Sequence, residues 1–159
     1  VPLIITAAGM FFFYSKIGLT HTYLGLILAH TALGTPFVVI TVTATLTGFD
    51  TNLIRASQSL GADTMRTFFK VIMPLILPGV ISGGLFAFIT SFDEVVVVMF
   101  VGSVEQITIP KQMWAGLRQE TSPVILCMAT CLVALSIALL TTVEMLRRRS
   151  ERLRGIKLR

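Results

Sequence analysis

Two adjacent carboxylates, Asp93 and Glu94, lie between two apolar stretches of the sequence. A carboxylate inside a membrane-spanning helix costs roughly 2.5–3.5 kcal/mol to insert unless it meets a cation or water. Ahead of the pair, small and polar residues recur at spacings of three and four along one side of a predicted helix: Gly79, Ser82, Gly83, Phe86, Thr90 and Asp93. Such a stripe faces protein or water rather than lipid, so the pattern favours a path for a positively charged solute.

A structural role is the alternative for each of these polar residues. Asp93 and Glu94 would then cap a helix or pair with Lys111, Arg118 or another helix. Because neighbours on a helix point about 100° apart, only Asp93 shares the stripe. We therefore favour the path for Asp93 and leave both roles open for Glu94. His30, in another apolar stretch, either lines a polar path or bonds to a neighbouring helix.

Motifs for catalysis or nucleotide binding do not accompany these acids. The sequence has no G-x-x-x-x-G-K-[ST] loop to hold a phosphate, and no H-E-x-x-H, C-x-x-C or G-x-S-x-G pattern. We expect a protein that is not an enzyme, with no catalytic residue, metal site or cofactor of its own, so that any ATP acts on a partner subunit. Cys127 and Cys131 are expected to be small apolar packing residues.

The composition indicates a membrane protein. Of 159 residues, 54% are hydrophobic and 13% are charged, and the mean hydropathy is +0.85. At 1.5 Å per residue, three stretches are long enough to span a bilayer: Tyr23–Leu46, Leu75–Val101 and Val124–Leu146. The shorter stretch Val1–Tyr14 is expected to be the remnant of a span in an amino-terminally truncated chain. We predict one transmembrane domain over residues 1–159, an all-α polytopic helical bundle of about four spans.

The basic residues predict the orientation of this domain. The net charge of +5 arises mostly at the end of the chain, where residues 147–159 follow the last span and contain seven Lys and Arg residues. Residues 50–73 contain three more, Arg55, Arg66 and Lys70. By the positive-inside rule, we expect the loop 50–73 and the basic tail 147–159 to be cytoplasmic. Basic residues clustered beside a span favour anionic lipid as their neighbour, and we expect no nucleic acid partner.

The loop 50–73 has the pattern of two short helices joined at a glycine. A first amphipathic helix is predicted by the spacing of Leu53, Ala56, Ser57 and Leu60. Gly61 is expected to take a positive φ at its end, and Asp63 to cap a second helix that runs to about Met73. These two helices are suited to docking on a partner, and the alternative is that they lie on the membrane surface.

The second of these helices is predicted to have an apolar stripe and a polar face. The stripe consists of Met65, Phe68, Phe69 and Ile72, while Arg66, Thr67 and Lys70 face away from it. Pro74 and Pro78 follow, and prolines at the beginning of an apolar stretch indicate the start of a new helix.

The loop resembles the EAA loop of permease subunits of ABC importers. The alanine, the glycine and the closing prolines of that loop are matched by Ala56, Gly61, Ala62, Ile72, Pro74 and Pro78. Further stretches are similar to the spermidine/putrescine-type branch of the family: Phe37–Asp50, Ser91–Phe100 and Ile109–Met113. Two positions depart from the pattern. Arg55 stands where the family has a glutamate, which reverses the charge there, and Ser57 stands where it has its second alanine.

The resemblance implies a function, a location and a set of partners. The chain would be a multi-pass permease subunit in the bacterial inner membrane, with its carboxy terminus in the cytoplasm. It would pair with a second permease subunit, two ATPase subunits and an extracytoplasmic substrate-binding protein. The residues that dock on the ATPase would be Arg55, Ala56, Ser57, Leu60, Gly61, Ala62, Asp63, Phe68 and Pro74. The residues that line the path of a cation such as a polyamine would be Ser82, Thr90, Ser91, Asp93 and Glu94.

Two alternatives to a polyamine importer stay open. In the first, the chain is part of an importer whose cargo is iron, thiamine, an opine or a phosphonate. This alternative stays open because the acidity of Asp93 and Glu94 is the only feature that favours a cation, and the fold does not determine the solute. Otherwise the chain is a membrane scaffold or channel without energy coupling, and its loop lies on lipid.

Overall fold

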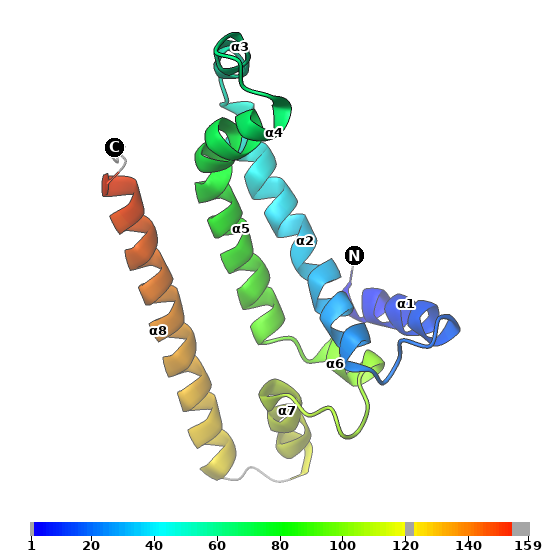
Figure 1. Ribbon diagram of the computed structural model, residues 1–159. Coiled ribbons are helices and arrows are strands. Elements are labelled where there is room, and N and C mark those ends of the chain that lie inside the picture. The colour runs from blue at the N-terminus through cyan, green and yellow to red at the C-terminus, as the bar shows by residue number, and fades with distance from the viewer. Residues whose placement is uncertain (1, 120–122, 154–159) are drawn as a thin grey trace. The chain divides into compact units, whose positions relative to one another are not determined.

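The computed structural model describes residues 2–119 and 123–153 (Figure 1). All of the regular secondary structure in these two ranges is helical, which confirms the predicted all-α class. The elements are α1 (Leu3–Lys16), α2 (Tyr23–Thr47), α3 (Asn52–Ser59), α4 (Thr64–Thr67), the π-helical turn η1 (Phe68–Ile72), α5 (Met73–Phe92), α6 (Val96–Val101), α7 (Ile109–Gln119) and α8 (Pro123–Leu153). They divide into two compact units, residues 1–34 with 88–159 and residues 35–87, which we describe separately.

Three helical runs in the described ranges are long and apolar enough to cross a membrane. They comprise Tyr23–Thr47, Thr64–Phe92 and Pro123–Thr142. The helix Leu3–Lys16 is apolar but shorter, so three spans rather than the expected four meet the length that a bilayer requires. Beyond Thr142, α8 continues as a helix to Leu153 and includes the first residues of the basic tail. Residues 154–159 of that tail lie outside the described residues.

The second of these runs differs from the prediction at both ends. The expected span Leu75–Val101 is wrong at its outer end, because α5 stops at Phe92 and α6 begins only at Val96. At its inner end, no loop separates the span from the loop helices, since α4, η1 and α5 follow one another directly. The predicted new start at the prolines is therefore not a break. The N–H of Met73 bonds to the carbonyl of Phe68 five residues earlier, and this wider π turn leaves room for the Pro74 ring.

The first unit has its core between α1, α2 and α6. Fully buried apolar side chains come from each helix: Ala7 on α1, Ala29 on α2, and Val97, Val98 and Val101 on α6. Figure 1 shows the short helix α6 beside α1, and these two helices contact each other directly. Because α6 is buried here, the segment that the sequence predicts to be the end of a span is instead a packed six-residue helix.

The second unit contains a close approach between α2 and α5. Gly79 and Gly83, one turn apart on α5, lie against Thr45 and Thr41, one turn apart on α2. A Cβ at Gly79 would collide with Oγ1 of Thr45, and a Cβ at Gly83 would lie 2.6 Å from the Cα of Val38. Small residues four apart are typical of tightly packed membrane helices. The small and polar stripe thus faces protein at these two positions, as predicted.

Candidate functional site

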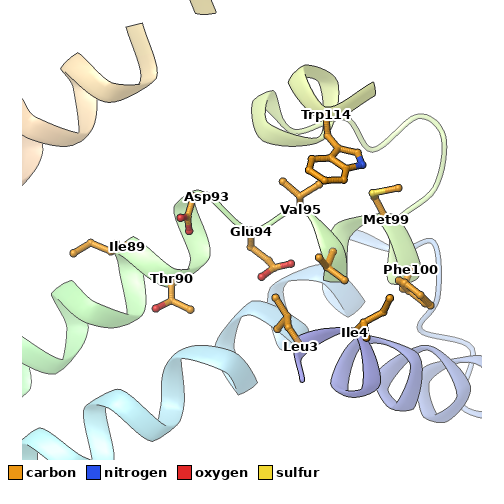
Figure 2. Close-up of a pocket in the computed structure, with 11 residues that line it drawn as sticks. Leu3, Ile4, Ile89, Thr90, Asp93, Glu94, Val95, Met99, Phe100 and Trp114 are labelled. Atoms are coloured by element: carbon orange, nitrogen blue, oxygen red, sulfur yellow. The ribbon is translucent and has the colours of Figure 1, made fainter. Parts of the chain in front are cut away.

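A pocket of about 660 Å³ lies in the first unit, where α5 ends and α6 begins (Figure 2). Its walls are mostly apolar and come from α1, α5, α6 and α7, and its polar side chains include Thr90, Asp93 and Glu94. Trp114 on α7 contributes an indole ring. A pocket of this size and character is typical of sites for small ligands.

The chain between α5 and α6 brings both predicted acids to this pocket. Residues 93–95 are outside the helices. The prediction that Asp93 continues the stripe of α5 is therefore wrong. Asp93 is exposed, whereas the Glu94 side chain is only 6% exposed. Figure 2 shows Glu94 extending from this break toward the residues of α1. The break therefore gives the two carboxylates different surroundings, and the better buried acid is Glu94.

Glu94 has the structural role that we left open as well as a place in the pocket. Its Oε1 accepts a hydrogen bond of 2.7 Å from the backbone N–H of Val97, in the first turn of α6. The first N–H groups of a helix have no partner within it, so this bond satisfies one of them. Glu94 thus caps α6 from within the wall of the pocket.

Of the two suggested basic partners of these acids, Lys111 is the one whose side chain the structure describes. Lys111 instead donates from Nζ to the carbonyl oxygens of Ser103, at 2.7 Å, and Gln106, at 3.1 Å. The side chain of Arg118 lies outside the described side chains. The positive charge of Lys111 is therefore used to hold the connection between α6 and α7.

The other two residues predicted for the path are placed differently. Ser91 shares a hydrogen bond of 2.9 Å with Nδ1 of His30 and does not line the pocket. This bond joins α5 to α2 and agrees with the bonding role that we considered for His30. Ser82 lies in the other unit, partly buried on α5. The structure thus brings together Thr90, Asp93 and Glu94 out of the five.

Several pocket residues carried no signal in the sequence. Leu3 and Ile4 lie in a stretch that we took for the remnant of a span, and Met99 and Phe100 lie in the predicted end of another. Trp114, on α7, is 47% exposed while lining the pocket. The sequence does not show the break at residues 93–95, and without this break the meeting of α1, α6 and α7 at the end of α5 could not be predicted.

The two cysteines are placed differently from the prediction. Cys127 and Cys131 are free thiols, exposed on α8 rather than packed in the interior of this chain.

The second site predicted from the sequence, the loop 50–73, lies within the other unit. Its helical elements α3, α4 and η1 cover residues 52–72, which we call the polar segment. Its central turn is formed as predicted, with Gly61 at φ +81°. The N–H of Ala62 bonds to the carbonyl of Ser57 at 3.1 Å, and the N–H of Gly61 to that of Gln58 at 2.9 Å, which is a Schellman ending of α3. Asp63 then caps α4 by accepting from the N–H of Arg66 at 2.7 Å.

Two hydroxyl side chains are buried inside the polar segment. Thr67, expected to face away from the apolar stripe, is 2% exposed and meets the buried Ser57. The apolar residues point outward: Leu60 is 88% exposed, Met65 67% and Phe69 58%. These exposed fractions leave an apolar surface on the segment for a neighbour to cover.

The other residues predicted for docking lie on or near this surface. Arg55, Ala56, Gly61 and Asp63 are exposed, Phe68 is 37% exposed, and Ala62 and Pro74 are partly buried. Ser57 is the exception, because its side chain is turned inward.

Comparison with known protein families identifies the chain. Residues 1–152 match the family of binding-protein-dependent transport system inner membrane components. The chain belongs to this family.

Relatives within this family of transport-system inner membrane components point to one branch. The chain is 32% identical over 149 residues to the spermidine/putrescine transport system permease protein PotC of Haemophilus influenzae, which covers 94% of this chain and 58% of that protein. It is 30% identical to the Escherichia coli K12 PotC over 92% of this chain and 56% of that protein. The putrescine transport system permease protein PotI of the same strain is 32% identical over 67% of this chain and 38% of its own length. The chain thus spans just over half of the PotC proteins.

Proposed function

We propose that this chain forms part of the solute path of an ATP-driven importer and couples that path to a separate ATPase subunit. The solute is a small cation, such as spermidine or putrescine. The observation that carries the proposal is the pocket at the end of α5, where a buried Glu94 and an exposed Asp93 lie among apolar walls. The names of the relatives support the same class of solute.

The chemistry of the pocket suits an alkylamine. A carboxylate attracts an ammonium group, and the aromatic face of Trp114 attracts a cation as well. Apolar side chains such as Ile89 and Met99 then contact the methylene groups between two amines. A bound cation also offsets the cost of placing Glu94 in apolar surroundings.

The polar segment is suited to receive force from a partner. Its turn is fixed by the positive φ of Gly61 and by the cap at Asp63, and its apolar residues point outward. The helical run then continues from Thr64 to Phe92, where the pocket begins.

The proposal includes the orientation and the assembly. The polar segment and the carboxy terminus face the cytoplasm, where the ATPase hydrolyses ATP; this chain supplies no nucleotide site. The complete assembly has a second permease subunit, two ATPase subunits and an extracytoplasmic substrate-binding protein, in the bacterial inner membrane.

Reconstitution of the full-length protein with its ATPase, partner permease and binding protein tests this proposal. We expect polyamines to stimulate ATP hydrolysis and to accumulate in the vesicles. The variant Asp93→Asn/Glu94→Gln should lower polyamine uptake at least about tenfold, the equivalent of losing one charge-assisted hydrogen bond.

Three results would contradict the proposal in different parts. If iron, thiamine, an opine or a phosphonate stimulated ATP hydrolysis and polyamines did not, the proposal that the solute is a polyamine would be wrong. Unchanged uptake by the double variant would refute the role of the acids. A chain that assembles with no ATPase would be a scaffold or channel.

A further inference from the structure

The hydroxyls of Ser57 and Thr67 meet in the interior of the polar segment. Their oxygen atoms are 2.6 Å apart and share a hydrogen bond, and the two side chains are 9% and 2% exposed. The bond joins the last turn of α3 to the last residue of α4, ten positions later in the chain. A buried hydrogen bond between side chains of two helices fixes their relative position, because breaking it leaves polar groups without partners.

Besides this hydrogen bond, α3 is held by its packing against α4 and η1 and by its own turn. A helix of eight residues is too short to be stable by itself. The apolar side chains of α3 are only partly covered: Leu53 is 42% exposed, Ile54 is partly buried, and Leu60, just beyond the end of the helix, is 88% exposed. Gly61, between α3 and α4, has no side chain with which to contact either helix. The orientation of α3 thus depends on this partial packing, on the turn and on the buried Ser57–Thr67 pair.

Ser57 connects the pair to the turn. Its backbone carbonyl accepts hydrogen bonds from the N–H groups of Leu60, at 3.2 Å, and Ala62, at 3.1 Å, while its side chain bonds to Thr67. Thr67 directly precedes the π turn η1, through which the helical run reaches α5. A force applied to α3 therefore has a bonded route through Ser57 and Thr67 into the long helix.

We propose that the Ser57–Thr67 hydrogen bond is a latch that holds α3 at a fixed angle to α4. Ser57 and Thr67 act as positioning residues: they make the polar segment rigid enough to pass the movement of the ATPase to the solute path. The coupling part of this inference rests on the proposed function, whereas the rigidity of α3 is measurable without it. Alanine, which the EAA loop has at position 57, cannot form this bond.

The test compares Ser57→Ala/Thr67→Val with the unchanged protein in the full-length, assembled complex. This double variant removes both partners at once, so no hydroxyl is left buried without a bond. We expect hydrogen exchange of the α3 amides to become on the order of three- to tenfold faster, the effect of losing one net hydrogen bond. Solute transported per ATP hydrolysed should fall by at least about twofold, while membrane insertion and assembly stay unchanged.

A covalent replacement of the latch gives a rescue. The γ atoms are 2.6 Å apart, near the sulfur–sulfur length of about 2.05 Å. The variant Ser57→Cys/Thr67→Cys, with Cys127 and Cys131 changed to alanine, should lose coupling when reduced and regain it when oxidised. The matched control is Ser59→Ala, because Ser59 bonds only within α3, to the carbonyl of Arg55 at 3.0 Å. This control should leave exchange and coupling unchanged.

Each result decides a separate question. Unchanged exchange in Ser57→Ala/Thr67→Val overturns the latch. Faster exchange with unchanged transport per ATP overturns its role in coupling. Absence of any ATPase coupling in the unchanged protein refutes the proposed function and the coupling role with it, and the exchange rates then still decide whether the latch exists.

Discussion

Glu94 combines two functions that usually belong to different residues. One of its carboxylate oxygens accepts the N–H of Val97 and so fixes the start of α6, and the side chain also lines the pocket. A carboxylate held in this way keeps its negative charge in one place. Asp93, its neighbour, is exposed and lines the same pocket.

Substitutions of Glu94 should separate the cap from the charge. Glu94→Ala removes the acceptor for Val97, and we expect it to cost about 0.5–2 kcal/mol of stability. Glu94→Gln keeps an oxygen acceptor at nearly the same position, so its loss of stability should be smaller while its loss of cation uptake is similar. Thermal unfolding by circular dichroism in detergent, together with uptake in vesicles, measures both.

The control for this pair is Asp93→Asn, which changes charge at an exposed position without a cap. It should leave the unfolding temperature unchanged. A Glu94→Ala variant as stable as the unchanged protein would show that the hydrogen bond to Val97 contributes nothing measurable.

Among the elements, the helical run Thr64–Phe92 is bounded by a turn at each end. The break at residues 93–95 ends α5 at the pocket, and the Schellman turn at Gly61 reverses the chain at the other end of the same helical run. Between them the run Thr64–Phe92 passes two prolines without a break, helped by the π turn η1. The run therefore connects the polar segment to the pocket.

Gly61→Val should uncouple ATP hydrolysis from transport while leaving the chain inserted in the membrane. A Cβ at Gly61 meets no atom within 4 Å, so the effect comes from the backbone at φ +81°, where a β-branched residue costs about 1–2 kcal/mol. Gly61→Asn should be milder, because asparagine tolerates this conformation. The ratio of solute transported to ATP hydrolysed in vesicles is the measurement.

The matched control is Gly84→Val, since a Cβ at Gly84 also meets no atom within 4 Å but the backbone there is an ordinary helix. It should couple normally. If Gly61→Val transports as efficiently as the control, the turn has no part in coupling.

Substitutions at Gly79 and Gly83 should separate α2 from α5 in the second unit. Gly79→Ala brings a Cβ against the Thr45 side chain, and we expect a loss on the order of 1–3 kcal/mol that Thr45→Ala partly restores. Gly83→Ala meets the backbone at Val38, so Thr41→Ala should not restore it. Thermal unfolding in detergent reports these differences.

Gly84→Ala again supplies the control and should be neutral or slightly stabilising, because alanine favours the helix over glycine. Equal unfolding temperatures for all three alanine variants would mean that the close approach of the two helices does not contribute to stability.

At the scale of the whole molecule, the distribution of charge predicts how the chain lies in the membrane. Arg55, Arg66 and Lys70 are exposed on the polar segment, and seven further basic residues follow the last span. The connection between α6 and α7 has Lys111, whose charge is bound by two carbonyls, and exposed residues such as Val104. By the positive-inside rule, we predict that the polar segment and the basic tail both face the cytoplasm.

Single cysteines test this orientation. With Cys127 and Cys131 replaced by alanine, Gln58→Cys should react with a membrane-impermeant thiol reagent only after the cells are opened, and Val104→Cys should react in intact cells. Both target positions are exposed, so access to the reagent and not burial decides the labelling. Labelling of Gln58→Cys in intact cells would reverse the orientation and place the polar segment away from any ATPase.

The sequence by itself determined the properties that depend on local pattern. Apolar stretches of spanning length predict membrane helices, and the glycine at 61 followed by Asp63 predicts the turn and its cap, because both depend on a few neighbouring residues. Family membership also follows from sequence alone. The sequence also singled out Asp93 and Glu94, both of which line the pocket.

Tertiary structure decided which of these residues meet. Hydrophobicity did not distinguish a continuous span from a helix that stops at Phe92, since the residues after the break are as apolar as those before it. α6 does not continue α5, because Val97, Val98 and Val101 are buried against α1 and α2. The contact between α1 and α6 joins residues some 90 positions apart in the chain, such as Ala7 and Val97. The Ser57–Thr67 pair was hidden for the same reason: periodicity assigns a face to each helix but not the partner that the face will contact.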